Sequence, residues 1–447
     1  MSDGKNRRRR ARRFLAAGTA LMMCVPHGWW SNLYGVGFAL AAAALCLRGQ
    51  RVDKGELPLL VGWGVFLAWC FVTAPGAFSP AGALRVAVFY LAGAALMGCA
   101  RGVFRTAEDA RILFGWIYAA LLFTAVYGFA IYALGRDGYG AAVDDSIVPR
   151  LGSTLEHGIN YGEFAAMAFP GAIGFALDRR GQAHRLFAAA LLLLPAAAIA
   201  LTYARTGWIA LAFLLGIVLY TRRKRALIPS AAVAAALLTL LPGSVAARAL
   251  SMLTWSDSAA SGRFTLWREC LAMLRSHWLL GVGLGPQNFY RAYLPFSTGK
   301  LPFAPPHANM GYLEMSLSLG ILGGTAYLVF FFGVFFCLRR AYRRAEGEQR
   351  RAISVTGAAL AGAALANIPE HLWFYPRVYF FWCVLYGLAL GLAGEDQQPP
   401  EDTDGCDRAP DQENTMVVLS MAQDSENSGR NTKPISCSAG TARRKPQ

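Results

Sequence analysis

The feature that most constrains this chain is a series of apolar blocks, each about 15 to 25 residues long and therefore able to cross a hydrocarbon core of ~30 Å as a helix. The run ILFGWIYAALLFTAVYGFAIYAL is one example. The blocks are continuously apolar rather than alternating, which predicts helices and not a barrel. Only 16% of the residues are charged, against roughly 25% in soluble domains. The sequence therefore predicts an all-α, polytopic membrane protein.

We expect twelve membrane-spanning helices. They lie near 14–30, 33–47, 57–74, 84–100, 112–134, 159–177, 186–203, 206–221, 226–242, 311–338, 352–368 and 375–393. The chain then divides into a membrane domain at 14–242 that holds nine spans and a second one at 311–393 that holds three.

The distribution of basic residues predicts the orientation of these spans. With the N-terminus placed in the cytoplasm, connectors on the cytoplasmic side carry 26 Lys and Arg, and connectors on the outer side carry nine. Cytoplasmic connectors are enriched in Lys and Arg in membrane proteins, so both termini are predicted to be cytoplasmic. Topology also accounts for the net charge of +16, and no nucleic-acid partner is expected.

Three segments are predicted to lie outside the bilayer. Residues 1–13 form a basic cytoplasmic N-terminus, and 394–447 form a polar, disordered cytoplasmic tail. Residues 243–310 form a large outer loop, long enough to be functional. Within this loop Phe264, Trp267, Leu271 and Leu274 recur at helical spacing among arginines, which predicts an amphipathic helix at the membrane surface.

Metal, cofactor and nucleotide sites are not expected. The nine cysteines form no CxxC pair, and the outer His, Asp and Glu residues lack the short spacing of metal ligands. The segment GVGLG, Gly281 to Gly285, lacks the spacing and the setting of a nucleotide-binding loop, so we interpret it as a flexible turn.

Two arginines on the outer side are candidates for binding a diphosphate. Arg205 lies in a tight hairpin between two apolar runs, and Arg263 lies near the start of the amphipathic helix. A guanidinium group binds phosphate oxygens through two parallel hydrogen bonds and stays charged. The alternatives are an arginine that reaches the lipid headgroups, for Arg205, and a solvated helix face, for Arg263.

His307 is the candidate for acid–base chemistry. The unperturbed pKa of a histidine side chain lies near 6.5, which suits a general base. Pro305 and Pro306 restrict the conformation of the backbone that leads to His307 and the next span. A capping or interfacial histidine is the alternative interpretation. The possible supporting residues on the same side are Asn309, Tyr312, Glu314, His157 and His371.

Three blocks of the sequence resemble the O-antigen ligase and polymerase superfamily. They are ARTGWIALAFLLGIVLY, then SGRFTLWRECLAMLRSHWLLGVGLGPQNFY, then PPHANMGYLEMSLSLGILGG, which together span roughly Tyr203 to Gly324. The twelve-span plan with a large outer loop before the tenth span is similar to that family as well. One departure is Ala308, which stands where an asparagine often directly follows the histidine.

The resemblance implies a metal-independent, inverting glycosyltransferase of the membrane GT-C type in the bacterial inner membrane. Its donor would be a glycan linked to undecaprenyl pyrophosphate, used at the periplasmic face. By the matching motifs, Arg205 and Arg263 would hold the pyrophosphate and His307 would deprotonate the acceptor hydroxyl.

The acceptor remains open at this stage. We expect a ligase that transfers O-antigen to lipid A-core. The alternatives are a polymerase that uses a second lipid-linked glycan, a protein O-oligosaccharyltransferase, and, in a different class, a transporter of lipid-linked glycans. A transporter predicts charged residues near the middle of the spans, and few are present.

Overall fold

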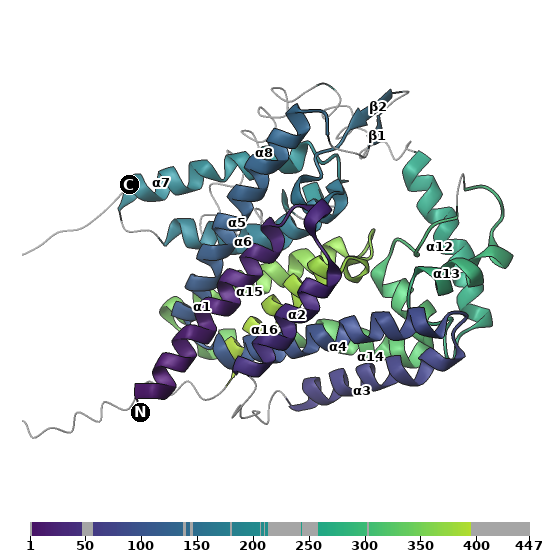
Figure 1. Ribbon diagram of the computed structural model, residues 1–447, viewed down its shortest axis with the longest axis horizontal. Coiled ribbons are helices and arrows are strands. Elements are labelled where there is room, and N and C mark those ends of the chain that lie inside the picture. The colour runs from purple at the N-terminus through teal and green to yellow at the C-terminus, as the bar shows by residue number, and fades with distance from the viewer. Residues whose placement is uncertain are drawn as a thin grey trace, which may run out of the picture. The chain divides into compact units, whose positions relative to one another are not determined.

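The computed structural model describes residues 2–46, 57–136, 140–143, 146–178, 181–205, 207–209, 211–212, 243, 258–301 and 304–394. These ranges fold almost entirely as helices (Figure 1). The predicted spans at 206–221 and 226–242, and the predicted tail, lie largely or wholly outside the described residues.

Each half of the chain contains a series of helices joined by short elements. The first half contains α1 (Ser2–Cys24), η1 (His27–Trp29), α2 (Asn32–Cys46), α3 (Leu57–Thr73), η2 (Ala74–Gly76), α4 (Pro80–Val103), α5 (Ala107–Ala133), β1 (Gly140–Val143), β2 (Ser146–Pro149), η3 (Ser153–Leu155), α6 (Gly158–Leu177), α7 (Gln182–Leu191) and α8 (Leu193–Ala200). The second half contains α12 (Ser258–Ser276), α13 (Pro286–Tyr293), η5 (Leu294–Phe296), α14 (Gly311–Arg344), α15 (Gly347–Ala366), η6 (Leu372–Phe374) and α16 (Pro376–Ala393).

The predicted helical architecture is confirmed for the part of the chain that the structure describes. Six helical segments are long and apolar enough to cross a membrane: 57–76, 80–103, 107–133, 182–200, 311–344 and 376–393. The count of twelve spans stays a prediction. One element was not predicted, a short antiparallel hairpin in which Gly140 of β1 pairs with Pro149 of β2.

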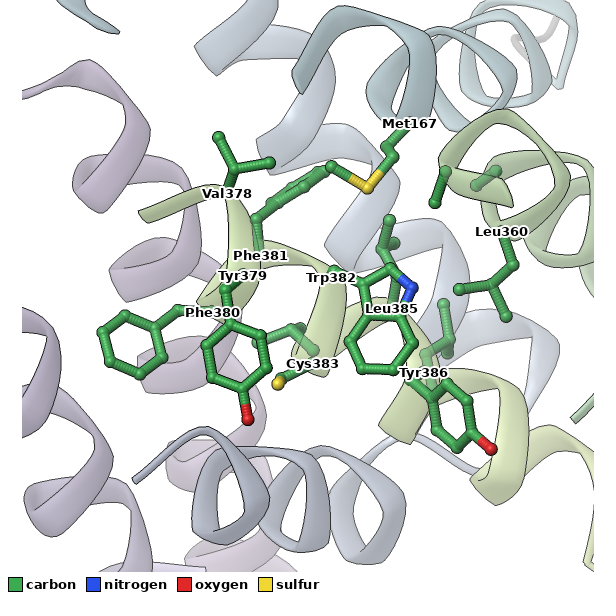
Figure 2. Packing of buried hydrophobic residues seen from close by; sticks show 14 of the residues in the cluster. Met167, Leu360, Val378, Tyr379, Phe380, Phe381, Trp382, Cys383, Leu385 and Tyr386 are labelled. Atoms are coloured by element: carbon green, nitrogen blue, oxygen red, sulfur yellow. The ribbon is translucent and has the colours of Figure 1, made fainter. Parts of the chain in front are cut away.

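α16 lies at the centre of the helical core. It packs against α4, α14 and α15 (Figure 1), and its aromatic side chains leave the helix in several directions. Figure 2 shows Phe381 directed toward Met167 of α6, while Trp382 stacks on Phe331 of α14 with ring centroids 5.3 Å apart. Such rings each bury a large apolar area, so packing against α16 stabilises the arrangement of the helices around it.

One end of the helices is held by ion pairs of the basic N-terminus. Helix α1 begins at Ser2, well before the predicted span at 14–30, because its arginines have partners: Arg8 and Arg12 contact Asp109 at 3.1 and 2.8 Å. At the same end the Gln349 amide donates to the Leu392 carbonyl at 3.4 Å. The charge distribution predicts that these segments all lie on the cytoplasmic side.

At the other end, the predicted outer connector at 135–158 and the ends of the predicted spans at 14–30 and 375–393 contact one another. The Thr154 hydroxyl donates to the Met23 carbonyl at 2.7 Å, and the Arg377 guanidinium donates to the Val25 carbonyl at 2.7 Å. His27 and Glu156 are 2.8 Å apart. We call this the site end of the molecule, because it carries the candidate residues described below.

The segment 258–310 forms a small helical unit with its own core at the site end. Leu266, Cys270 and Met273 of α12 pack with Phe289 and Tyr293 of α13. The buried side of α12 therefore differs from the predicted apolar face. Among the predicted residues, Phe264 and Leu271 are exposed, Trp267 is half-buried and Leu274 packs against this small core.

A kink in α14 attaches this unit to the membrane helices. Gly320 has φ +67°, a non-helical backbone conformation that interrupts the helix there. The carbonyls of Leu317 and Ser318 instead accept from the N–H groups of Val282 and Gly283, both at 2.9 Å. The GVGLG segment is thus a fixed backbone clamp rather than a flexible turn: a Cβ on Gly281 would lie 2.5 Å from the Ser318 carbonyl oxygen.

Candidate active site

His307 lies in the tight loop that connects the outer unit to α14. Its side chain is 7% exposed, and its Nδ1 accepts a hydrogen bond from the Asn309 N–H at 3.1 Å. Asn309 has φ +48°, a left-handed conformation that asparagine adopts more readily than most residues. The two residues therefore form a compact turn that fixes the ring.

Neighbouring helices hold the same loop in place through Ala308. The Ala308 N–H donates to Glu314 Oε2 at 2.8 Å, and the Ala308 carbonyl accepts from the Trp267 indole at 3.1 Å. Glu314 also accepts from the Ser318 hydroxyl at 3.3 Å. Ala308, the residue that departs from the family pattern, thus contributes backbone hydrogen bonds that hold the loop. Glu314 fixes the loop by accepting one of them.

The connector between α15 and α16 brings a second histidine to this loop. The Gly311 N–H donates to the carbonyls of Asn367 and Glu370, at 3.0 and 2.9 Å, and so joins the connector to the start of α14. His371 follows directly, 7% exposed. Its ring centroid lies 5.7 Å from that of His307, with the two rings nearly perpendicular, and Phe374 lies against His307 at 4.5 Å.

Both imidazoles are neutral in this setting. Burial, together with the positive charge of Arg263, lowers the pKa of His307 to about 4. Burial, together with the neighbouring His307, also holds the pKa of His371 well below its usual value. At neutral pH each ring therefore offers one N–H and one lone pair.

Arg263 is held beside the histidines by a buried carboxylate. Its guanidinium donates to Glu370 Oε1 and forms an ion pair with it. Burial raises the pKa of Glu370, and the positive charges of Arg263 and Arg150 oppose this shift. A guanidinium has five N–H donors, so one contact to Glu370 orients Arg263 while other donors stay available to an anion.

Arg205 directly follows the turn after α8, at the start of the next helical stretch, and Arg150 contacts that turn. The Arg150 Nε donates to the Thr202 carbonyl at 2.7 Å, while its charge acts on both Glu370 and His157. Arg205 itself is half-buried. Arg150 thus contacts the turn that precedes Arg205 and acts electrostatically on Glu370, the partner of Arg263.

Besides Glu314, three of the predicted supporting residues make structural hydrogen bonds. The Tyr312 hydroxyl donates to the Ala364 carbonyl at 2.8 Å and joins α14 to α15. His157 is the N-cap of α6, where its Nδ1 accepts from the Ile159 N–H at 3.2 Å. Asn309 contributes its N–H to His307. Within the described ranges, no group of three or more His, Cys, Asp or Glu residues could hold a metal ion, and the absence of a metal stays a prediction.

Sequence reasoning missed two residues of this cluster as site residues, Glu370 and Arg150. Glu370 is the buried partner of Arg263, yet the two are separated by 107 positions in the chain. An available signal was the position of Glu370 next to His371 in a connector with no basic residue. A carboxylate there needs a cation from another segment, since buried charges are normally paired.

A cavity of about 480 Å³ opens beside the histidines. Its lining includes aromatic side chains and several polar ones, among them Ser79, Arg85, Gln287, Glu314 and His371. Pro306 and Phe374 contribute to the wall, so the cavity reaches the His307 loop. An apolar pocket with a few convergent polar groups is the usual form of a small-molecule site.

Fold and site together define a helical membrane protein with a buried arginine–carboxylate–histidine cluster at one end of its helices. Residues 189–328 match the family model described as O-antigen ligase, which confirms the resemblance of this part of the chain to the O-antigen ligase superfamily. The matched segment includes Arg205, Arg263 and His307. No curated protein matches the chain.

Proposed function

We propose that this protein is a glycosyltransferase of the O-antigen ligase type, which moves a glycan from undecaprenyl pyrophosphate to a lipid A-core hydroxyl. The observation that carries the proposal is the Arg263–Glu370 ion pair beside His307 and His371. Arg263 and His307 lie inside the segment that matches the ligase family, and Glu370 and His371 lie outside it. The reaction needs a cation for the leaving group and a proton acceptor for the nucleophile, and both residue types are present.

The arginines suit a diphosphate leaving group. When the bond between the anomeric carbon and the diphosphate oxygen breaks, negative charge grows on that oxygen. Arg263, oriented by Glu370, and Arg205 would stabilise this charge through hydrogen bonds that strengthen as the reaction proceeds. Since the charged diphosphate leaves without protonation, no separate general acid is required.

We further propose that the site end faces the periplasm in the inner membrane of a bacterium, with twelve spans and both termini in the cytoplasm. The basic residues at the end opposite the site support this orientation through the positive-inside rule. The exposed Phe264 and Leu271 of α12 would then face the lipid headgroup region, where the lipid-linked donor lies.

The test is reconstitution of the purified protein in vesicles with a lipid-linked glycan and one of two acceptors. We expect transfer to lipid A-core. Transfer only to a second lipid-linked glycan would identify a polymerase, which the matched family and the site chemistry also accommodate. Movement of the donor across the vesicle membrane without a new glycosidic bond would instead indicate a transporter and contradict the proposal.

A further inference from the structure

The cavity of about 480 Å³ beside the histidines has the lining of a site for a polar ligand. His371 and Trp373 both line it, and they are only 7% and 3% exposed. Among the residues that the structure describes, neither the ring nitrogens of His371 nor the indole N–H of Trp373 has a hydrogen-bond partner. Buried polar groups are normally bonded, and leaving them unsatisfied costs free energy. A lipid acyl chain cannot bond them, so these two side chains indicate a ligand with hydroxyl or other polar groups.

Two walls of the cavity are fixed to each other by the side chain of Asn288 in α13. Its Oδ1 accepts from the N–H of Ser79, the N-cap of α4, at 2.5 Å, and its Nδ2 donates to the Ser79 carbonyl at 3.2 Å. Nδ2 also donates to the Leu284 carbonyl at 2.7 Å. The Gln287 side chain lies over the first turn of α4, where its Oε1 is 3.8 Å from the position of a Cβ on Gly82. Walls that are already in place lose little conformational freedom when a ligand binds.

Arg85 provides positive charge in this cavity. It lies one turn after Gly82 on α4, is exposed, and places its guanidinium 5.9 Å from the ring centroid of Phe89. Of the residues that the structure shows lining the cavity, Arg85 is the one with a permanent positive charge, and within the described ranges it forms no ion pair. It is also the one basic residue between Lys54 and Arg101, at the predicted outer end of its span. The positive-inside rule does not account for a cation at that end.

The carboxylate in the described lining is bonded to other groups. Glu314 accepts from the Ala308 N–H at 2.8 Å and from the Ser318 hydroxyl at 3.3 Å. It therefore holds the protein's own loop and helix, whereas the donors of Arg85 remain available. The charge of the cavity thus favours a ligand with a negative group.

We propose that this cavity binds the acceptor saccharide, and that Arg85 recognises an anionic substituent on it, a phosphate or a carboxylate. This inference rests on the proposed glycosyl transfer. The described lining includes neither Arg205 nor Arg263, the residues to which the donor diphosphate is assigned. It does include Pro306, which directly precedes His307. A ligand in the cavity therefore reaches the His307 loop along α4 and α13 instead of past the two arginines, as the second substrate must.

The rest of the lining suits a sugar. The rings of Phe89 and Phe374 offer apolar surface to the face of a sugar ring, and the Gln287 amide and the Trp373 indole can bond its hydroxyls. A guanidinium binds two oxygens of a phosphate or carboxylate at once. Arg85 is thus a residue that determines which acceptor is bound, and it takes no part in the proton transfer.

The test measures transfer from a neutral lipid-linked glycan in vesicles to three forms of lipid A-core: intact, with its phosphates removed, and with its carboxylates reduced to alcohols. We expect Arg85→Gln to raise the KM for the intact acceptor about 10- to 100-fold, the usual effect of losing a charge-assisted hydrogen bond. Its kcat should change about twofold or less, because the bond is equally strong in the ground state and in the transition state. Arg85→Lys, which keeps the charge but loses the two-pronged geometry, should give an intermediate KM. Arg275→Gln is the matched control, since Arg275 is exposed on α12 and outside the described lining, and it should keep the wild-type KM.

The modified acceptors identify the group that Arg85 binds. Removing that group should raise the KM of the wild type to the value of Arg85→Gln. An equal effect of Arg85→Gln on all three acceptors would overturn the proposal. An unchanged KM for all of them, as expected if Arg85 binds phospholipid headgroups, would overturn it too. So would a variant that raises only the KM of an acidic donor glycan, because the cavity would then hold the donor.

Failure of the proposed function would be seen separately. If the wild type forms no glycosidic bond, that function is wrong. Equilibrium binding of labelled intact acceptor without donor still tests the cavity, and Arg85→Gln should weaken this binding by the same factor as the KM. Equal binding by wild type and variant would contradict the role of Arg85.

Discussion

Helix α16 and the connector that leads into it bury polar groups in opposite ways. Within α16 the Tyr379 hydroxyl donates to the Tyr90 carbonyl at 2.8 Å, and the Tyr386 hydroxyl donates to the Phe330 carbonyl at 2.6 Å. A few residues earlier, His371 is also buried but has no hydrogen-bond partner among the described residues. The helix is thus organised for stability, whereas the connector keeps an unsatisfied group beside a cavity.

The two regions therefore contribute to the free energy of unfolding with opposite sign. A buried hydroxyl with a partner contributes about 1 kcal/mol, but a buried polar group without one costs about 1–3 kcal/mol. The aromatic packing of α16 offsets that cost a short distance from the site. Substitutions in α16 should therefore act on folding, and substitutions in the connectors of the site end should act on transfer.

Trp382→Ala should have the largest effect on folding. The side chain is fully buried in the core that Figure 2 shows, where it contacts rings of Phe331, Trp373 and Tyr386. Loss of such a ring typically costs about 3–5 kcal/mol, which denaturant unfolding in detergent would measure. Leu193→Ala is the control on an exposed helix face, with an expected change of about 0.5 kcal/mol or less. Equal effects would show that α16 is not the central helix.

Arg263→Ala should lower the transfer rate about 10²–10³-fold, the usual effect of removing one group that stabilises charge in the transition state. The same variant leaves Glu370 buried without its partner, so its free energy of unfolding should fall as well. Adding Glu370→Gln to this variant should restore the free energy of unfolding, because burying a neutral amide costs less than burying an unpaired carboxylate. The transfer rate should stay low. Recovery of transfer in the double variant would contradict diphosphate binding by Arg263.

The site should also make stability depend on pH. The pKa of His307 is about 4 in the native protein and about 6.5 in an unfolded chain. As the pH falls from 6.5 toward 4, the unfolded chain binds a proton that native His307 does not, so the free energy of unfolding decreases, by up to about 3 kcal/mol from this residue. Unfolding at pH 7, 6 and 5 should show a shallower slope in His307→Gln than in wild type. Identical slopes would mean that His307 is not buried as a neutral ring.

Gly320→Ala tests the connection between the two regions. A Cβ at this position would lie 2.1 Å from the Leu279 carbonyl oxygen, and φ is +67°. We expect a loss of about 1–3 kcal/mol from backbone strain, with α12 and the His307 loop displaced from α14. The matched control is Gly62→Ala in α3, where nothing lies within 4 Å of the added Cβ. If both variants unfold alike, the kink does not hold the outer unit.

Much of the helical architecture could be predicted because the apolar blocks are long and their boundaries carry Pro, Gly and charged residues. The span expected at 375–393 corresponds to α16 at 376–393. The basic connectors also contact acidic partners at one end, as with Arg12 and Asp109. Local composition specifies these features, so a single sequence contains them.

The site could be predicted only in part. His307 and Arg263 stand out locally, but the pairing of Arg263 with Glu370 and the approach of His371 depend on contacts across most of the second half of the chain. The buried face of α12 could not be chosen from its periodicity, because the partner surface on α13 and α14 selects it. The kink at Gly320 likewise depends on backbone groups of the segment before α13.

The most direct test of the central claim is the configuration of the new glycosidic bond. The purified protein in vesicles would be given a lipid-linked glycan of known anomeric configuration and lipid A-core, and the product would be examined by NMR. Direct attack by the deprotonated acceptor hydroxyl, with the diphosphate leaving from the opposite face, predicts inversion at the anomeric carbon. Retention of configuration, or no new bond on either acceptor, would contradict the account.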